Sequence, residues 1–241
     1  FKKIVIHESD AIPGLANKFL SYITDNIAVS FEETKKFFPD KNVYVTGNPV
    51  RLKYLDLTKD EAEKILNIQA NRPIIFISGG SQGAQKINKI ILESLDELLE
   101  KYFVIWSVGK NNYDSIKLRI SNKNNIKLFD FLNEKELAAA YVLCDLVIGR
   151  AGAGTIFETA AFGKPSILIP LERKSGDQPI NAQSYARAGA TIIAKESELN
   201  KELLLAKISQ GLEESSKLSQ NAQKFAKIDA GEQLAQILLD L

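Results

Sequence analysis

Residues 73–90 read Pro-Ile-Ile-Phe-Ile-Ser-Gly-Gly-Ser-Gln-Gly-Ala-Gln-Lys-Ile-Asn-Lys-Ile. The run Ile74–Ile77 is apolar at every position, which is typical of a strand covered by helices on both faces of a sheet. The glycines at 79, 80 and 83 predict a tight turn, and a long amphipathic helix is expected after it. A buried strand, a glycine turn and a helix in this order indicate an α/β fold.

The same alternation of short β-branched runs and helical stretches extends along the whole chain. It predicts right-handed crossovers and mainly parallel sheets, so the fold class is α/β. The expected strands are Lys3–His7, Asn26–Ser30, Val43–Thr46, Pro73–Ser78, Phe103–Val108, Ile126–Phe129, Asp145–Ile148, Ser166–Ile169 and Thr191–Ala194. The expected helices are Pro13–Ile23, Phe31–Phe37, Thr58–Asn67, Ala84–Glu100, Asn133–Leu143, Thr155–Phe162 and Pro179–Ala188, with several more from Leu199 to Leu241.

A boundary is predicted near Gly47–Arg51, where the Asn48-Pro49 pair breaks regular structure before a charged helix. Residues 73–194 carry enough expected strands for an open sheet of their own, whereas residues 1–46 do not. The first part is therefore expected to be the second half of a domain. The chain contains no methionine, even at position 1, which also predicts a piece of a longer protein.

Composition excludes several classes of protein. Lys and Arg total 31 against 30 for Asp and Glu, a net charge of +1 that offers no electrostatic argument for a nucleic-acid partner. The single cysteine, Cys144, excludes an internal disulfide framework. No apolar run approaches the roughly 18 residues of a membrane-spanning helix.

Two glycine-rich turns are candidate phosphate sites. After the turn at residues 79–83, the start of the next helix offers unpaired N–H groups and the positive end of its dipole to an anion. This segment is neither a P-loop nor a complete dinucleotide fingerprint, so a tight turn without a ligand is the alternative. The second candidate is Gly149–Thr155, which follows the expected strand Asp145–Ile148. Ligands of open α/β sheets bind at the carboxyl ends of such strands.

Two further features lie close to these turns in sequence. Glu158 follows the second turn by one helical turn, where a buried carboxylate accepts the hydroxyls of a ribose and an exposed one is ordinary. The stretch Ser175–Asn181 is dense in short polar side chains, which suit the hydroxyls of a sugar. A loop with a helix N-cap explains this stretch equally well.

Taken together and in order, these segments resemble the MurG family of glycosyltransferases, part of family 28, which converts lipid I into lipid II in peptidoglycan synthesis. The resemblance covers essentially the whole chain. The matching segments are His7-Glu8-Ser9-Asp10 with Ile12–Leu15, Thr46–Arg51, Gly79–Ala84 with Asn88, Arg150–Thr155 with Glu158, and Gln178 with Asn181.

The resemblance implies a GT-B architecture of two Rossmann-like domains that face each other across a cleft. Residues 1–51 would be the second half of the acceptor-binding domain, with the final helix, about 229–241, packed back on it. Residues 52–228 would be the domain that binds the UDP-sugar. The implied reaction is inverting transfer of N-acetylglucosamine from UDP-GlcNAc to undecaprenyl-diphospho-MurNAc-pentapeptide, by a peripheral enzyme on the cytoplasmic face of the bacterial inner membrane.

The resemblance also implies roles for individual residues. Leu132 corresponds to the position whose backbone contacts uracil, and Glu158 to the one that holds the ribose. The remaining positions matched to substrate binding are Asp10, Arg51, Gly80, Ser81, Gln82, Ala153, Gly154, Thr155, Asp177 and Gln178, while His7 and Glu8 match positions in the cleft where catalysis takes place. No Asp-x-Asp stretch is present, so no cofactor is required and a divalent cation would have no ligand motif.

Several positions depart from the family pattern. The glycine-rich acceptor loop of the family, with the histidine proposed as its base, is absent, and His7 is the only histidine. Ser9-Asp10 stands for the usual Gln-Asn, Asp177 for a Gln and Gly154 for a Leu. The two carboxylates leave the identity of the donor sugar open.

Two other functions are therefore kept as alternatives. One is a related glycolipid synthase that transfers a hexose from a UDP-hexose to diacylglycerol. The other is a donor-binding module that needs a separate N-terminal subunit. The sequence does not fix the oligomeric state.

Overall fold

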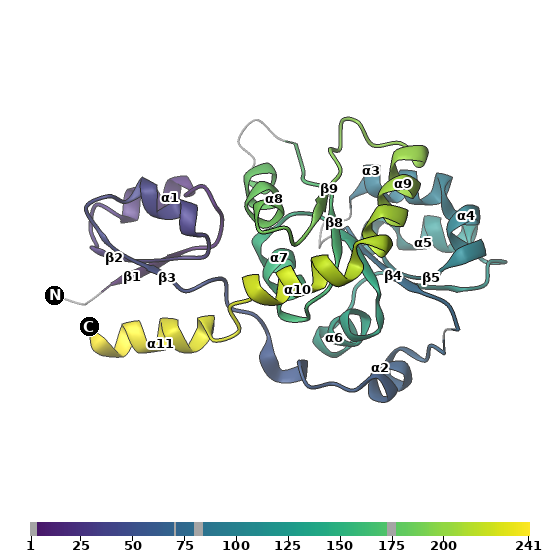
Figure 1. Ribbon diagram of the computed structural model, residues 1–241, viewed down its shortest axis with the longest axis horizontal. Helices are drawn as coiled ribbons and strands as arrows, with labels where there is room; N and C mark the ends of the chain where they lie inside the picture. Colours follow the sequence, from purple (N-terminus) through teal and green to yellow (C-terminus); the bar gives the residue numbers. More distant parts are fainter. Residues whose placement is uncertain (1–3, 70, 80–83, 173–176) are drawn as a thin grey trace.

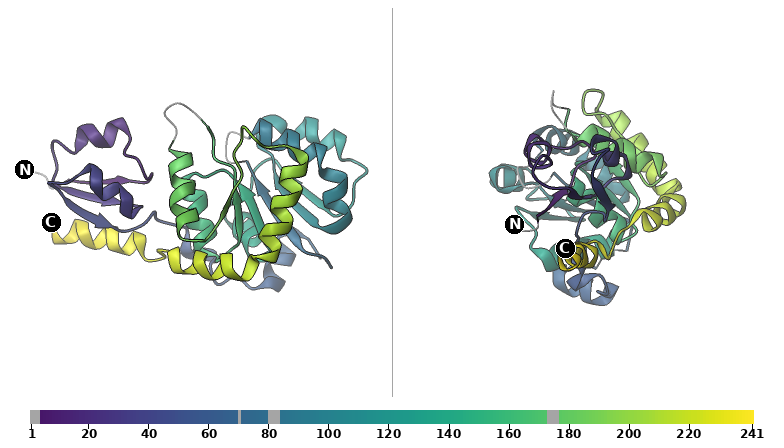
Figure 2. Two further views of the ribbon diagram at one scale, coloured as in Figure 1. Left: turned by 45° about the horizontal axis from the view of Figure 1, so that its top comes forward. Right: turned by 90° about the vertical axis from the view of Figure 1, so that its left-hand side faces the viewer.

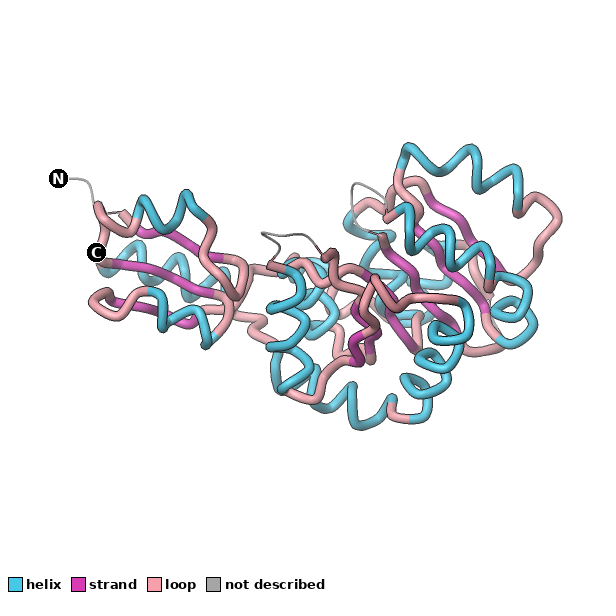
Figure 3. The backbone as a smooth tube through the Cα atoms, turned by 90° about the horizontal axis from the view of Figure 1, so that it is seen from above, coloured by secondary structure: helices cyan, strands magenta, loops and turns pink. Residues whose placement is uncertain are grey.

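The computed structural model describes residues 4–69, 71–79, 84–172 and 177–241. Within them the chain forms two separate sheets, one of three strands and one of six, both entirely parallel (Figures 1 and 3). The strands are β1 (Val5–Glu8), β2 (Asn26–Val29), β3 (Asn42–Val45), β4 (Ile74–Ser78), β5 (Phe103–Ser107), β6 (Ile126–Phe129), β7 (Leu146–Gly149), β8 (Ser166–Leu168) and β9 (Ile192–Ile193). The predicted α/β class and all of the predicted strands are confirmed, with ends that differ by up to two residues.

The helices cover both sheets and connect the strands. They are α1 (Leu15–Leu20), η1 (Glu32–Phe37), η2 (Leu52–Tyr54), α2 (Lys59–Leu66), α3 (Gln85–Glu93), α4 (Leu95–Lys101), α5 (Lys110–Arg119), α6 (Glu134–Leu143), α7 (Ala153–Ala161), α8 (Gln178–Arg187), α9 (Lys201–Glu213), α10 (Ser215–Phe225) and α11 (Ala230–Asp240). We call β1–β3 with α1 and η1 the small lobe, and the six-stranded sheet with its helices the large lobe.

Two predicted elements differ from the structure, and one helix was not predicted. The helix expected over Ala84–Glu100 is divided at Ser94, whose hydroxyl donates to the Ile90 carbonyl at 2.9 Å. The segment 32–37 is a 3₁₀ helix rather than an α-helix. Helix α5 was not predicted at all, because it buries only Ile116 and so lacks an apolar face in its sequence.

The large sheet has the strand order β6-β5-β4-β7-β8-β9. The chain adds β5 and β6 on one side of β4 and β7 to β9 on the other, so the strand order reverses between β4 and β7. At this switch point Ser78 and Gly149 are register partners at the carboxyl ends of their strands. The two glycine turns therefore start next to each other, on the same edge of the sheet. Open α/β sheets bind ligands at such a point.

The core of the large lobe explains the continuous apolar run of β4. Ile75 and Ile77 pack against α3, α4 and α9 on one face, whereas Ile74 and Phe76 pack against α2 and α6 on the other. Cys144 is buried in the second layer, and burial raises the pKa of its thiol to about 12. A thiol held neutral in this way fills space and is not a nucleophile.

The chain crosses between the lobes twice, through residues 46–51 and through 225–229 (Figures 1 and 2). At the crossings, Phe31 of the small lobe meets Phe157 and Phe225, with ring centroids 5.3 and 6.3 Å away. After the second crossing, α11 runs beneath the three-stranded sheet, as Figures 1 and 2 show. The two crossings touch, because Gly47 lies against the Lys227 side chain.

Gly47 has a φ of +83°, and a Cβ there would come within 2.4 Å of the Lys227 Cβ. We expect Gly47→Ala to lower the free energy of unfolding by about 1–3 kcal/mol, through backbone strain and this clash. Gly231→Ala in α11 is the matched control, since its Cβ would meet nothing within 4 Å and alanine favours a helix. Urea denaturation of both variants measures the difference, and equal stabilities would contradict this account.

Candidate functional site

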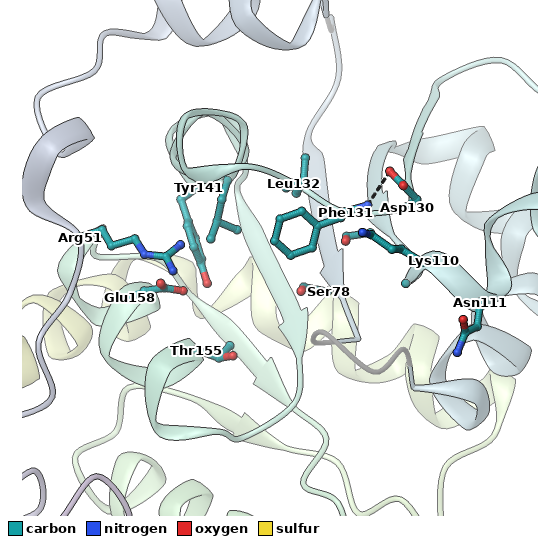
Figure 4. A pocket seen from close by; sticks show the side chains of 13 residues that line it. Arg51, Ser78, Lys110, Asn111, Asp130, Phe131, Leu132, Tyr141, Thr155 and Glu158 are labelled. Atoms are coloured by element: carbon teal, nitrogen blue, oxygen red, sulfur yellow. Dashed lines mark hydrogen bonds between the residues drawn. The ribbon is translucent and has the colours of Figure 1, made fainter.

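A cavity of about 580 Å³ opens at the carboxyl ends of β4, β5 and β7, at the switch point of the large sheet (Figure 4). Its lining combines a guanidinium, two carboxylates, an ammonium group, hydroxyls and aromatic rings. The residues are Arg51, Ser78, Ser107, Gly109, Lys110, Asn111, Asp130, Phe131, Leu132, Leu137, Tyr141, Thr155 and Glu158. Such a mixture of polar and aromatic groups in a concave site is typical of a small-molecule pocket.

Helix α7 begins at this cavity with its N-terminus open. Among the described residues, no side chain caps it and no atom lies within 4 Å of a Cβ placed at Gly152 or Gly154. The first residues, Ala153, Gly154 and Thr155, therefore present free N–H groups and the positive end of the helix dipole. The helix start can bind an anion such as a phosphate group.

The turn before α7 is held by an ion pair that the sequence did not point to. The Arg150 guanidinium donates to the Ile169 carbonyl at 3.1 Å and pairs with the Glu196 carboxylate. The two side chains are only 11% and 13% exposed. Arg150 thus fastens the end of β7 to the segments that follow β8 and β9, and it fixes the position from which α7 starts.

Glu158 faces Arg51 and Tyr141 across the inner part of the cavity, as Figure 4 shows. Burial raises the pKa of the Glu158 carboxyl, and the positive charge of Arg51 offsets part of that rise. No hydrogen bond to the Glu158 carboxylate is formed within the described part of the chain. A buried carboxylate with open lone pairs can accept hydroxyl groups of a ligand.

Leu132 has open backbone groups of its own. Its N–H and C=O form no hydrogen bond with any described residue, although the side chain is buried. The preceding N–H, that of Phe131, is bound by the Asp130 carboxylate at 2.7 Å. The Phe131 ring stays 55% exposed beside the cavity. An adjacent donor and acceptor next to an aromatic ring suit the edge and face of a nucleobase.

Glu8 and His7 form structural hydrogen bonds on the small-lobe side. The two Glu8 carboxylate oxygens accept from the backbone N–H groups of Asp10 and Gly14, at 3.0 and 2.9 Å. Glu8 also accepts from the Asn17 amide at 2.9 Å, and it is buried. His7 Nε2 lies 3.0 Å from the Gly47 carbonyl, which makes that nitrogen the donor. Both side chains hold the loop after β1 and the first crossing in place.

The third polar cluster lies at the start of α8, opposite the loop after β1. Asp177 is the N-cap residue of α8, and burial together with the charges of Asp10 and Glu8 raises the pKa of its carboxyl. Gln178 Oε1 accepts from the Leu171 N–H at 2.9 Å. Its amide NH₂ group, bound to no described residue, is left for a ligand.

The structure brings together part of the predicted site. Arg51, Leu132, Thr155 and Glu158 line the cavity, and Ala153 and Gly154 begin the helix beside it. The cavity is not lined by His7, Glu8, Asp10, Asp177 or Gln178, which lie toward the small lobe. Gly80, Ser81 and Gln82 fall outside the described residues. Within those residues, no group of three or more His, Cys, Asp and Glu side chains could hold a metal ion.

Sequence reasoning missed several lining residues, among them Lys110, Asn111, Phe131 and Tyr141. A signal for the first two was present in the sequence, since Gly109 follows the expected strand Phe103–Val108. In the structure Gly109 has a φ of +83°, which is typical of a turn. The carboxyl ends of neighbouring parallel strands meet at one edge, so the turn after β5 was a candidate once β5 was placed beside β4.

The family model for the glycosyltransferase family 28 C-terminal domain matches residues 74–237. The chain belongs to glycosyltransferase family 28. A Clostridium perfringens (strain 13 / Type A) protein is 40% identical over 230 residues, which are 95% of this chain and 63% of that protein. A Clostridium botulinum (strain Hall) protein is 37% identical over 95% of this chain and 64% of its own length. Both are named UDP-N-acetylglucosamine--N-acetylmuramyl-(pentapeptide) pyrophosphoryl-undecaprenol N-acetylglucosamine transferase.

The family 28 chain thus spans slightly less than two thirds of the length of these curated relatives. Among solved structures it is similar to Acinetobacter baumannii MurG, with a TM-score of 0.79 and 25% identity over 99% of this chain and 67% of that one. The UDP-GlcNAc 2-epimerase from Neisseria meningitidis, solved with UDP-GlcNAc bound, shares the fold at 19% identity and a TM-score of 0.68, over 95% of this chain and 65% of that one. The resemblance to family 28 is confirmed.

The raised pKa of Glu158 predicts how stability depends on pH. An ionised Glu158 costs stability, so Glu158→Gln is expected to melt at a higher temperature than wild type at pH 7. This advantage shrinks as the pH falls through the raised pKa toward the ordinary value of 4.5, because wild type then becomes protonated. Melting temperatures measured from pH 4 to pH 8 test the trend.

Glu61 is the control of opposite sign, since hydrogen bonds from Thr58 lower the pKa of its carboxyl. Glu61→Gln should melt below wild type at pH 7, and this deficit should fade as the pH falls through the lowered pKa. If Glu158→Gln also melts below wild type at pH 7, burial is not the dominant influence on the pKa of the Glu158 carboxyl.

Proposed function

We propose that this chain is the donor-binding part of an enzyme that transfers N-acetylglucosamine from UDP-GlcNAc to a lipid-linked muramyl-pentapeptide acceptor. The supporting observation is the register pairing of Ser78 with Gly149, which starts both glycine turns at one edge of the sheet. It aligns the open end of α7 with the cavity that holds Glu158 and Leu132. The names of the family 28 relatives support the choice of donor and acceptor.

The cavity suits a uridine diphosphate in one orientation. Uracil would lie on the Leu132 backbone, the ribose hydroxyls would donate to Glu158, and the diphosphate would reach the start of α7. The sugar would then extend past Gln178 toward the small lobe. Asp10 of the small lobe and Asp177 of the large lobe lie near enough for their charges to interact, and we propose that they select the sugar.

The mechanism follows from where charge develops. When the acceptor hydroxyl displaces UDP with inversion at the anomeric carbon, the C–O bond to the diphosphate breaks and negative charge grows on the phosphate oxygens. The N–H groups of Ala153, Gly154 and Thr155 are already oriented toward that charge, and Arg51 adds a positive charge in the cavity. Groups that are fixed before the reaction stabilise the transition state without reorganising.

His7 and Glu8 support this reaction by positioning. Glu8 binds two backbone N–H groups and an amide with its carboxylate oxygens, so it holds the small-lobe loop that faces the sugar site. The His7 bond to the Gly47 carbonyl fixes the first crossing beside that loop. We propose that both residues act as positioning residues, which hold the backbone on the small-lobe side of the cleft in place.

Gly154→Asp tests the anion site directly. The new side chain has room, since a Cβ there meets nothing within 4 Å, but its carboxylate would occupy and neutralise the helix start. Wild type should gain about 2.7 kcal/mol of stability at a UDP concentration of 100 times Kd, while ADP and GDP give much less. Gly154→Asp should lose most of the UDP effect, as measured by thermal shift.

Gly231→Asp is the matched control for this experiment. Gly231, like Gly154, is the second residue of its helix and has open space around it, but α11 lies under the small lobe. Its response to UDP should equal that of wild type. A wild-type chain that UDP fails to stabilise would contradict the proposed function, whatever the variants do.

We further propose that the small lobe rests on a membrane surface where the lipid-linked acceptor is presented. Helix α1 buries none of its residues, and Leu15 and Phe19 are 86% and 71% exposed. Tyr22 and Ile23, just after it, are also exposed, and Lys18 lies among them. Apolar side chains beside a cation suit the interface of an anionic bilayer. No helix in the described ranges is long and apolar enough to cross a membrane.

Replacing Leu15 and Phe19 by serine should weaken binding to phosphatidylglycerol vesicles by about tenfold or more, because the two apolar side chains that would enter the bilayer are lost. Co-sedimentation measures the change. Serine at Leu238 and Leu239 provides the control, since these exposed leucines lie on α11, on the other side of the small sheet (Figure 1). Equal losses in both double variants would contradict a role specific to α1.

A further inference from the structure

Asn181 lies where its own helix meets two other segments, and its side chain bonds to both of them. It belongs to α8 and is completely buried. The Ala11 N–H donates to Asn181 Oδ1 at 2.8 Å, and Asn181 Nδ2 donates to Asp10 Oδ1 at 2.7 Å. The same Nδ2 donates to the Ala151 carbonyl at 3.2 Å. One amide thus joins the small lobe, α8 and the turn before α7.

The small-lobe end of this junction is rigid. The Asp10 N–H is held by Glu8, and the buried Thr34 hydroxyl donates to the Ala11 carbonyl at 3.2 Å. Thr34 belongs to η1, on the same lobe. Asp10 and Ala11 therefore move with the small lobe and not as a free loop.

The other end of the junction is the turn that starts α7. Ala151 lies between Arg150, which is fastened to the sheet, and Gly152, the N-cap of α7. Ala151 is itself buried, so its carbonyl has no access to water if Asn181 withdraws. An unpaired buried carbonyl is costly, and the turn would shift to regain a partner. The open helix N-terminus would shift with it.

We propose that Asn181 is a positioning residue that couples the place of the small lobe to the affinity of the α7 turn for a diphosphate. When the small lobe is bonded to Asn181, the turn is held in the arrangement that binds the donor. By thermodynamic reciprocity, a bound diphosphate holds the small lobe against α8. The inference rests on the proposed function for the identity of the ligand.

A second contact between the lobes serves as an internal control. Glu33 of η1 accepts from the Ser184 hydroxyl at 3.1 Å and pairs with Arg187, both in α8. This contact joins the same lobe to the same helix but touches no residue of the α7 turn. Loss of the Glu33 contact loosens the lobes in general, whereas loss of the Asn181 contact also releases the turn.

The test compares Asp10→Ala, Asn181→Ala, Asp10→Asn and Glu33→Ala in the 241-residue chain, with UDP as the probe. UDP lacks the hexose that is transferred, so in the proposed orientation a residue of the small lobe that faces the site of that hexose would have no direct contact with UDP. We expect Asp10→Ala and Asn181→Ala to weaken UDP binding by about 5- to 20-fold in calorimetry. Asp10→Asn keeps an acceptor for Asn181 Nδ2 and should stay within about twofold of wild type. Glu33→Ala removes the second contact between the lobes and should also stay within about twofold.

Amide hydrogen exchange of residues 152–156 without UDP gives a second readout, which does not depend on the proposed ligand. It should accelerate in Asp10→Ala and in Asn181→Ala but not in Glu33→Ala. The proposal is overturned if Asp10→Ala changes neither readout, or if Glu33→Ala weakens UDP binding as much as Asp10→Ala. If wild type binds no UDP, the proposed function fails, while the exchange rates still decide whether the lobe controls the turn.

Discussion

The site depends on the pairing of β4 with β7, which fixes Ser78 opposite Gly149. A shift of one residue in this register would turn Ile75 and Ile77 toward the opposite layer of helices, so the packed core enforces the pairing. The close approach also favours glycine, since a Cβ at 149 would lie 3.1 Å from the Ser78 carbonyl oxygen, a tight contact. Packing far from the ligand thereby sets the spacing of the two turns.

Much of this fold was predictable because its signals are local. The expected strands are all present, since runs such as Ile74–Ile77 and Leu146–Ile148 are apolar on both faces and bounded by turn residues. The capping box of α2 was likewise predictable from Thr58 and Glu61, which lie close in sequence. Helix α5 was not predicted because it lies on the surface and buries only Ile116, so its sequence shows no clear apolar face.

The site was less predictable, for a different physical reason. The glycine turns and Glu158 could be predicted from residue type and from their spacing from an expected strand. Phe131 and Tyr141 join the cavity only through the pairing of β5 and β6 and the packing of α6, which no local pattern contains. The Arg150–Glu196 pair spans 46 residues, and the Asn181 junction connects positions 170 residues apart. Such contacts depend on the finished topology.

Stability and binding oppose each other at Glu158. Burial raises the pKa of this carboxyl, so the free protein bears a cost for keeping it ionised at neutral pH. A pair of ribose hydroxyls would return hydrogen bonds to the carboxylate, and part of the binding free energy would come from removing that cost. The N-terminus of α7 would likewise contribute to binding, because its unpaired N–H groups are unfavourable in the free protein and an anion would satisfy them.

The small lobe shows why the contacts between the lobes matter for binding. Its own buried cluster consists of Ile6, Ile27, Val29 and Phe38, and α1 adds no buried residue. So small a core supplies little stability, and the position of the lobe therefore depends on Phe31 in the aromatic junction and on its bonds to α8. A ligand that strengthens even one of those bonds would change the position of the lobe more than it changes the large sheet. If the cavity binds a diphosphate as proposed, the small lobe is thus the part of the molecule most able to respond to it.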